Sequence, residues 1–194
     1  RAKDWDSDPK KVERARVVAD AIRKTIPLSN NMNALEYGCG TGLLSFALQS
    51  DLGQITLADT SQGMLDVLKE KIAAAGVTNM HPVRLDLVTV SLPSERYHLT
   101  YSLMTLHHIP DTKVILNKFY DLLEPNGHLL VADLEKEDGS FHTDGTTDVH
   151  KGFVHNELQQ QVASAGFGNI TFSTVYEIKK KIDDKEKIFP VCLM

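Results

Sequence analysis

The chain has 194 residues, of which 42% are hydrophobic and 24% are charged, and its formal net charge at pH 7 is −5. These values are typical of one globular domain over residues 1–194 and exclude an intrinsically disordered chain. The negative balance disfavours a general electrostatic binder of nucleic acid, because such proteins are normally basic.

No apolar run approaches the roughly 20 residues that a membrane span requires. The stretch Arg1–Lys11 lacks the apolar core of a signal peptide. Two cysteines are too few for a disulfide scaffold or a cysteine-built zinc site. We therefore expect a cytoplasmic protein that does not bind membranes.

Helices and strands alternate along the first half of the chain. A helix begins at Asp8-Pro9, an N-cap acid followed by proline, and ends before Pro27. The pattern then predicts two strands, Ala34–Tyr37 and Ile55–Asp59, and two helices, Thr41–Leu48 and Ser61–Ala75.

The second half continues the alternation and then departs from it. It predicts the strands Val83–Leu85, Leu99–Met104 and His128–Ala132, and the helices Asp111–Leu123 and Asn156–Ala165. Ile170–Ile182 and Lys185–Leu193 read as two strands that Asp183-Asp184 joins in an antiparallel hairpin. The alternation predicts an α/β fold with a mostly parallel sheet covered on both faces.

Two segments are candidate covers of a binding site. Residues 1–30 form an N-terminal helix or lid, and Trp5 either folds over the cleft or anchors the helix. Residues 134–153 are irregular for longer than structural connections usually are, and form a candidate substrate loop.

The strongest local signal is Gly38-Cys39-Gly40-Thr41-Gly42, between a predicted strand and a predicted helix. Glycine permits a tight turn and lets a ligand approach the backbone. The spacing does not match G-x-G-x-x-G, so it disfavours a dinucleotide site.

Three acids, Glu36, Asp59 and Asp86, lie at the ends of three successive predicted strands. Ligands of parallel sheets bind at the carboxyl ends of the strands, so we expect these acids to converge there. A single aspartate at a strand end is more often a helix cap or a turn former. Three carboxylates suit a cationic ligand better than a pyrophosphate, which they would repel.

These residues resemble the motifs of a known family. The stretch Leu35–Gly42 is similar to motif I of the class I S-adenosylmethionine-dependent methyltransferases, and Tyr101–Ile109 resembles the ubiquinone/menaquinone-biosynthesis branch. The family's Pro-Gly-Gly turn falls on Pro125-Asn126-Gly127. His98 departs from the family, which usually has an aspartate there. The resemblance implies a Rossmann-like, doubly wound, seven-stranded sheet.

The resemblance also implies a cofactor, S-adenosylmethionine, with S-adenosylhomocysteine as its product. Asp59 would accept hydrogen bonds from the ribose hydroxyls, Asp86 with the Leu87 amide would bind the adenine amino group, and Met64 would pack on the adenine. The implied cofactor-binding set is Glu36, Gly38, Cys39, Gly40, Gly42, Asp59, Thr60, Met64, Asp86, Leu87 and Met104.

His107 is the candidate general base or acceptor-positioning group, since it follows the fourth strand near the expected position of the methyl group. The alternative is that His107 and His108 cap the loop. A metal site from His142 and His150 matches no zinc spacing, so we expect none. The acids of residues 134–153 suggest a neutral or cationic acceptor, or simply a solvated loop.

The sequence therefore predicts methyl transfer to a small-molecule acceptor. Nucleic acid is a disfavoured partner, because no Asn/Asp-Pro-Pro-aromatic motif follows the fourth strand. Two alternatives stay open: an NAD(P)-dependent oxidoreductase and a non-catalytic protein that binds S-adenosylmethionine.

Overall fold

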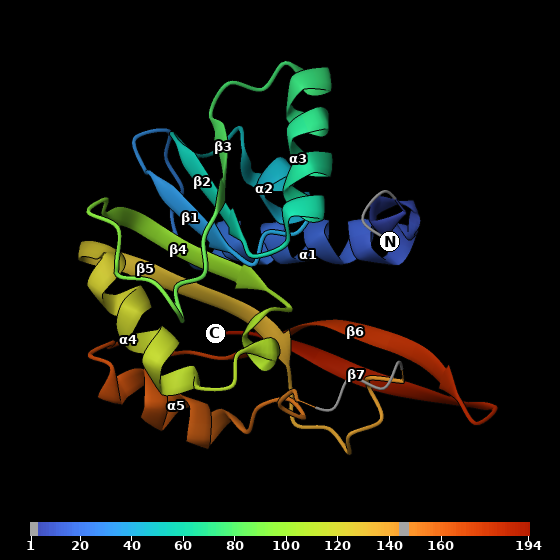
Figure 1. The fold of residues 1–194 in the computed structure, drawn as a ribbon. Helices are drawn as coiled ribbons and strands as arrows, with labels where there is room; N and C mark the ends of the chain where they lie inside the picture. Colours follow the sequence, from blue (N-terminus) through green and yellow to red (C-terminus); the bar gives the residue numbers. More distant parts are fainter. Residues whose placement is uncertain (1–3, 144–147) are drawn as a thin grey trace.

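The sheet has seven strands in the order β3-β2-β1-β4-β5-β7-β6 (Figure 1). It is seen in a computed structural model that describes residues 4–143 and 148–194. The parallel strands are β1 (Ala34–Tyr37), β2 (Ile55–Asp59), β3 (Met80–Arg84), β4 (Tyr97–Leu103) and β5 (Leu123–Leu134). Strand β7 (Lys185–Leu193) runs antiparallel to both of its neighbours, β5 and β6 (Ser173–Ile182). The predicted fold class is confirmed.

Helices cover both faces of the sheet (Figure 1). On one face lie α1 (Pro9–Thr25), α2 (Leu43–Leu48) and α3 (Gln62–Ala75), which share one hydrophobic cluster. On the other lie α4 (Thr112–Leu122) and α5 (His155–Ser164), with a second cluster. Two short 3-10 helices, η1 (Trp5–Ser7) and η2 (Leu106–His108), complete the described elements. No described helix combines the length and the apolar character that crossing a bilayer requires.

The predicted helix caps explain where three helices begin. The side chains of Asp8, Ser61 and Asp111 accept hydrogen bonds from backbone N–H groups at the starts of α1, α3 and α4. Gly76 ends α3 with a left-handed φ of 64°. These positions were visible in the sequence because each cap depends on one residue type at one place.

Some predicted boundaries were wrong. The helix predicted from Thr41 begins at Leu43, because Gly42 has a φ of 77° and lies outside the helix. The strand predicted over 83–85 spans Met80–Arg84, since its early residues pair with β2 despite a proline. The strand predicted over 128–132 lies within β5, which extends to Leu134 and thus enters the predicted substrate loop.

The C-terminal hairpin turns at Asp183 and Asp184, whose φ angles of 49° and 61° are those of a tight hairpin turn. Strand β7 lies between β5 and β6, so the hairpin forms one edge of the sheet. Near the start of β4, His98 Nδ1 accepts a hydrogen bond from the Asn33 N–H at 3.1 Å. The histidine therefore holds β4 to the loop that leads into β1.

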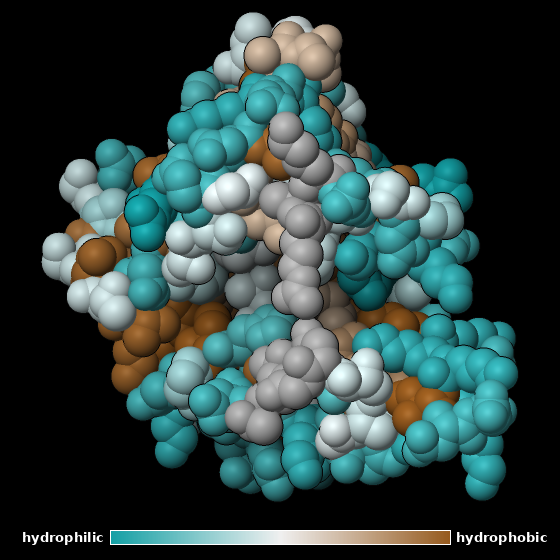
Figure 2. Space-filling view, turned by 45° about the vertical axis from the view of Figure 1, so that its right-hand side comes forward, coloured by the Kyte–Doolittle hydropathy of each residue, from teal (hydrophilic) through white to brown (hydrophobic). Residues whose placement is uncertain are grey.

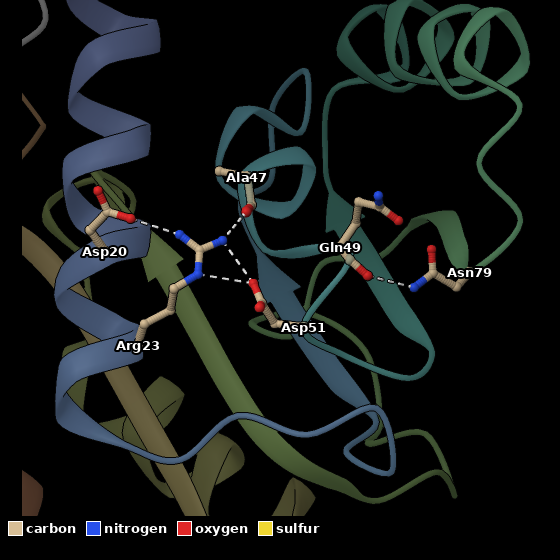
Figure 3. A network of polar contacts seen from close by, with 6 residues as sticks. All are labelled: Asp20, Arg23, Ala47, Gln49, Asp51 and Asn79. Atoms are coloured by element: carbon tan, nitrogen blue, oxygen red, sulfur yellow. Dashed lines mark hydrogen bonds and ion pairs between the residues drawn. The ribbon is translucent and has the colours of Figure 1, made fainter.

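Arg23 joins α1 to the segment around α2 (Figure 3). Its guanidinium lies 2.7 Å from the Asp51 carboxylate and 2.8 Å from Asp20, and it donates to the Ala47 carbonyl at 2.5 Å. In the same region the Asn79 amide donates to the Gln49 carbonyl at 2.9 Å. These contacts fix α1 beside the loop that leads from α2 to β2.

Replacing Arg23 with alanine is expected to lower the free energy of unfolding by about 1 kcal/mol, because the pair is partly exposed but includes a backbone carbonyl. In a chain of this size, that corresponds to a fall of roughly 2–4 °C in the melting temperature. Thermal unfolding followed by circular dichroism measures it. Arg16→Ala, at an exposed position of the same helix, is the control and should leave the melting temperature unchanged. An equal loss in both variants would contradict the assignment.

Candidate functional site

A cavity of about 1070 Å³ opens at the carboxyl ends of β1, β2 and β4. Figure 2 turns this side of the molecule towards the reader and shows the surface hollowed between an upper and a lower part. Helix α1 and strand β6 supply the wall opposite the strand ends. The lining includes these predicted residues: Glu36, Gly38, Cys39, Gly40, Asp59, Thr60, Met64, Asp86, Met104 and His107.

Two predicted residues, Gly42 and Leu87, are not part of this lining. A Cβ added at Gly42 would lie 2.6 Å from Leu68 Cδ1, so this glycine is needed for packing against α3. Leu87 is fully buried, and its backbone N–H donates to the Tyr37 hydroxyl at 3.2 Å. The amide expected to help bind adenine is thus engaged within the protein.

The glycine loop leaves β1 through left-handed backbone conformations, with φ angles of 71° at Gly38 and 53° at Gly40. A Cβ added at Gly38 would lie 2.2 Å from the Thr105 side chain. A Cβ added at Gly40 would meet nothing within 4 Å. Gly38 therefore serves packing, whereas Gly40 presents bare backbone to the open cavity.

Asp59 fixes this loop from the end of β2. Its Oδ2 accepts a hydrogen bond from the Gly40 N–H at 2.7 Å, and its Oδ1 accepts from the Ser61 N–H at 2.8 Å. A carboxylate offers about four acceptor sites, so each oxygen can accept a further hydrogen bond from a ligand hydroxyl. Asp86 lies two residues beyond β3, and its Oδ1 accepts from the Val88 N–H at 2.9 Å.

Glu36 is buried on β1, beneath the glycine loop. Its carboxylate accepts hydrogen bonds from the Ser45 hydroxyl and from the Ser45 N–H, and the same hydroxyl contacts the Tyr101 hydroxyl at 2.6 Å. Burial raises the pKa of Glu36 to about 8 despite the hydrogen bonds from Ser45. A cationic ligand group in the cavity would favour the ionised carboxylate and lower that pKa.

Cys39 is also buried in this loop, and burial raises the pKa of its thiol. The thiol is therefore neutral at physiological pH and is a packing group rather than a nucleophile. Met104, at the end of β4, has a φ of 55°, a conformation that non-glycine residues seldom adopt. Such strained residues cluster at ligand sites.

The N-terminal segment closes one side of the cavity. The Asp6 carboxylate accepts hydrogen bonds from the Thr41 hydroxyl and the Lys71 ammonium, each at 2.5 Å, and so ties η1 to the glycine loop. Trp5 lines the cavity, and Lys11 Nζ lies 3.4 Å from the centroid of its ring. The structure thus places Trp5 at the cleft, as one of the two interpretations of the sequence suggested.

His107 is buried and is held by Asp133, a strand residue that the sequence did not single out. Its Nδ1 lies 2.6 Å from Asp133 Oδ1, and its backbone N–H donates to Asp133 Oδ2 at 3.2 Å. The His150 backbone N–H donates to the His107 carbonyl at 2.8 Å, but the His150 ring points elsewhere, with its Nε2 2.9 Å from the Ile109 carbonyl oxygen. Asp133 thus fixes the orientation of the His107 ring.

Of the two interpretations of the acids in residues 134–153, the structure favours the solvated loop, since none of the described acids there lines the cavity. Glu137 accepts hydrogen bonds from backbone N–H groups of its own loop, and Asp138 pairs with Lys187 at 2.9 Å. Phe141 and His142 are the described residues of this loop that line the cavity. The acids outside the lining are Glu135, Glu137, Asp138 and Asp148, and Asp144 lies outside the described residues.

Basic side chains form the wall that α1 and β6 supply. They are Lys10, Lys11, Arg14, Lys179 and Lys180, and the Asp8 carboxylate at the start of α1 lines the cavity beside them. The Nε of Arg14 is buried with no hydrogen-bond partner among the described residues, and burial lowers the pKa of this group. Sequence reasoning missed this wall, because the two basic segments are far apart in the chain and each reads as a solvated surface.

Comparison with known proteins identifies the domain. A family profile for a methyltransferase domain matches residues 34–127, the segment that contains the glycine loop, Asp59 and Asp86. The chain carries a class I methyltransferase domain. This methyltransferase domain is 35% identical over 158 residues to an uncharacterized methyltransferase of Schizosaccharomyces pombe, covering 78% of this chain and 52% of that protein.

A demethylmenaquinone methyltransferase of Listeria monocytogenes is 26% identical over 113 residues, covering 57% of this chain and 48% of that protein. The chain thus spans about half the length of these curated relatives. Among solved structures, phosphoethanolamine N-methyltransferase 2 of Haemonchus contortus, in complex with phosphomonomethylethanolamine and S-adenosylhomocysteine, superposes with a TM-score of 0.70 at 20% identity. That match covers 80% of this chain and 38% of the other, and it shows a shared fold.

The raised pKa of Glu36 predicts a specific dependence of stability on pH. The folded protein retains the Glu36 proton up to about pH 8, whereas the unfolded chain loses it near pH 4.3. The free energy of unfolding should therefore fall as the pH rises through this window, by up to about 1.4 kcal/mol per pH unit from this group. Urea unfolding at several pH values measures the slope.

Glu36→Gln keeps the shape of the side chain and removes the titration. The variant should lose this part of the slope, so that its stability exceeds that of the wild type increasingly above pH 5. The difference between the two proteins isolates Glu36 from the other titrating groups. Parallel pH profiles of the two proteins would mean that Glu36 is ionised in the folded state.

Proposed function

We propose that this methyltransferase domain binds S-adenosylmethionine and transfers its methyl group to a small-molecule acceptor that carries an anionic group. The observation that carries the proposal is the division of one cavity into an acidic half and a basic half. The glycine loop with Glu36, Asp59 and Asp86 forms the first half, and α1 with β6 forms the second.

The acidic half fits the chemistry of the cofactor. Gly40 leaves open space beside bare backbone, and Asp59 retains acceptor sites for hydroxyl groups. Glu36 would be ionised by a bound cation, which lowers its pKa from about 8, and would then stabilise that positive charge. The bound cofactor supplies a methyl group on a positively charged sulfur, which leaves as a neutral thioether. The carboxylates of Asp59 and Asp86 would repel the pyrophosphate of NAD(P), so the oxidoreductase alternative is disfavoured.

The protein contributes to the reaction chiefly by position. Methyl transfer is an in-line displacement, and holding the donor and the acceptor in line supplies much of the acceleration. Met104 and His107 line the cavity beyond the end of β4. We assign His107 to the acceptor, as the group that orients it or takes its proton.

The basic half favours an acceptor with a carboxylate or a phosphate. The Nε of Arg14 has no hydrogen-bond partner among the described residues, and burial lowers the pKa of the guanidinium. A bound anion would pair with this group and offset the free-energy cost of burying its charge. Trp5 and Phe141 add aromatic surface to the same cavity. These features suit a compact anionic molecule with an apolar part.

Gly40→Asn is expected to abolish binding of S-adenosylhomocysteine without unfolding the protein. Asparagine tolerates left-handed backbone angles, and its side chain would fill the space that Gly40 leaves open. We expect the dissociation constant, measured by calorimetry, to rise at least tenfold. Fluorescence of Trp5, the only tryptophan, gives a second readout because this residue lines the cavity.

Gly76→Asn is the matched control. Gly76 also has a left-handed φ, of 64°, and open space at its Cβ, but it ends α3 and does not line the cavity. Both variants should melt at similar temperatures, and only Gly40→Asn should lose the ligand. Unchanged affinity in Gly40→Asn would place the cofactor elsewhere, and stabilisation of the wild type by NAD(P) alone would overturn the proposal.

The acceptor class is tested with labelled S-adenosylmethionine and pairs of small molecules that differ only by a carboxylate or its amide. The carboxylates should be methylated faster. With the acceptor so found, Arg14→Gln should raise its KM about tenfold and leave the affinity for S-adenosylhomocysteine unchanged. Arg16→Gln, on an exposed face of the same helix, should change neither. Preference for the amides would reject the anionic acceptor, and a silent screen would favour a non-catalytic protein that binds the cofactor.

A further inference from the structure

Three histidine rings converge at one side of the cavity. His107 and His108 belong to η2, and His142 comes from the loop after β5. One ring nitrogen of each lies within 4.8 Å of the other two. The ring centroids of the adjacent pair are 4.1 Å apart, and each lies 5.3 Å from that of His142. Segments far apart in the sequence thus bring three imidazoles together.

The His107 ring is prepared to act as a ligand. The Asp133 carboxylate only accepts hydrogen bonds when ionised, so the 2.6 Å contact assigns the proton to His107 Nδ1 and leaves a lone pair on Nε2. That Nε2 is buried and has no hydrogen-bond partner among the described residues. Leaving such an atom unsatisfied costs about 1–3 kcal/mol. Metal-bound histidines almost always donate their other ring N–H to a carboxylate, a backbone carbonyl or water, as His107 does to Asp133.

We infer that His107, His108 and His142 bind a divalent transition-metal ion, with Zn²⁺ the best match to three neutral imidazoles. Tetrahedral zinc with Zn–N distances of about 2.0–2.1 Å needs nitrogens roughly 3.4 Å apart. The ring nitrogens lie within 4.8 Å of one another, so metal binding requires the rings to move closer together, chiefly those of the exposed His108 and of His142 in the loop. Three protein ligands leave a position open, as in catalytic zinc sites.

This inference deepens the proposed function and rests on it for its chemical consequence. The cluster lines the same cavity, so the open position faces the space assigned to the acceptor. A hydroxyl or thiol bound there would have a lowered pKa and release its proton to water near neutral pH. The acceptor atom then forms its bond to the methyl carbon while the carbon–sulfur bond breaks and its electron pair stays on sulfur.

The test measures metal binding directly and does not depend on activity. Chelator-treated protein is titrated with Zn²⁺ by calorimetry and with Co²⁺ by visible absorption, since tetrahedral Co²⁺ absorbs far more strongly than octahedral Co²⁺. We expect one ion per chain and a tetrahedral Co²⁺ spectrum. His108→Ala, an exposed position, should weaken binding at least tenfold, and Asp133→Asn should weaken it by 10–100-fold, as outer-shell substitutions do.

His155→Gln is the matched control. Among the described residues, Glu135, His155 and Cys192 form a second group with ligand atoms within 4.8 Å of one another, and it does not line the large cavity. Binding that survives in His155→Gln and weakens in His108→Ala supports the site. Equal affinity in the wild type and His108→Ala, loss of the ion in His155→Gln, or an octahedral spectrum would overturn it.

Binding of S-adenosylhomocysteine, measured with and without chelator, separates the two proposals. The cofactor half contains none of these histidines, so its affinity should not depend on the metal. Metal binding without cofactor binding would reject the proposed function and leave the histidine site standing. Cofactor binding without metal binding at these histidines would reject only the site.

Discussion

The hydrogen bond from Gly40 to Asp59 ties together the two strand ends on which the cavity is built. The loop after β1 turns through left-handed conformations. The N–H groups of Gly38 and Cys39 donate to the Ala58 carbonyl, and the Gly40 N–H donates to the Asp59 carboxylate at 2.7 Å. The second oxygen of the same carboxylate holds the start of α3 through Ser61. One side chain therefore positions a loop and a helix, and leaves acceptor sites facing the cavity.

The charges around the cavity follow from the topology rather than from composition. Acids at the ends of successive parallel strands meet at one edge, whereas α1 and β6 run along the opposite wall with their lysines and Arg14. The net charge of −5 conceals this separation. Negative charge at one end of the cavity favours a cationic ligand there, and positive charge at the other end favours an anionic ligand. The two charges therefore determine which of two bound molecules lies at which end.

Much of the fold could be predicted from the sequence, because local patterns of residues mark where its helices and strands begin and end. The strands Ala34–Tyr37 and Ile55–Asp59 agree with the structure residue for residue, and Asp8, Ser61 and Asp111 mark helix starts. β3 was misplaced, since its pairing with β2 outweighs its weak local pattern. Within the site, the glycine loop and its acids could be predicted from the sequence, because glycines after a strand and acids at strand ends are recognisable local patterns.

The rest of the site depends on pairs that no local pattern shows. Asp133 and His107 lie on different elements and meet only because β5 pairs with β4. Asp133 reads in the sequence as one more acid at the end of an apolar strand. Once it binds Nδ1, His107 can no longer be a simple loop cap, since its remaining nitrogen is buried and carries a lone pair. That lone pair faces the cavity beside two further imidazoles, so it is placed to accept a proton from an acceptor or to hold a cation.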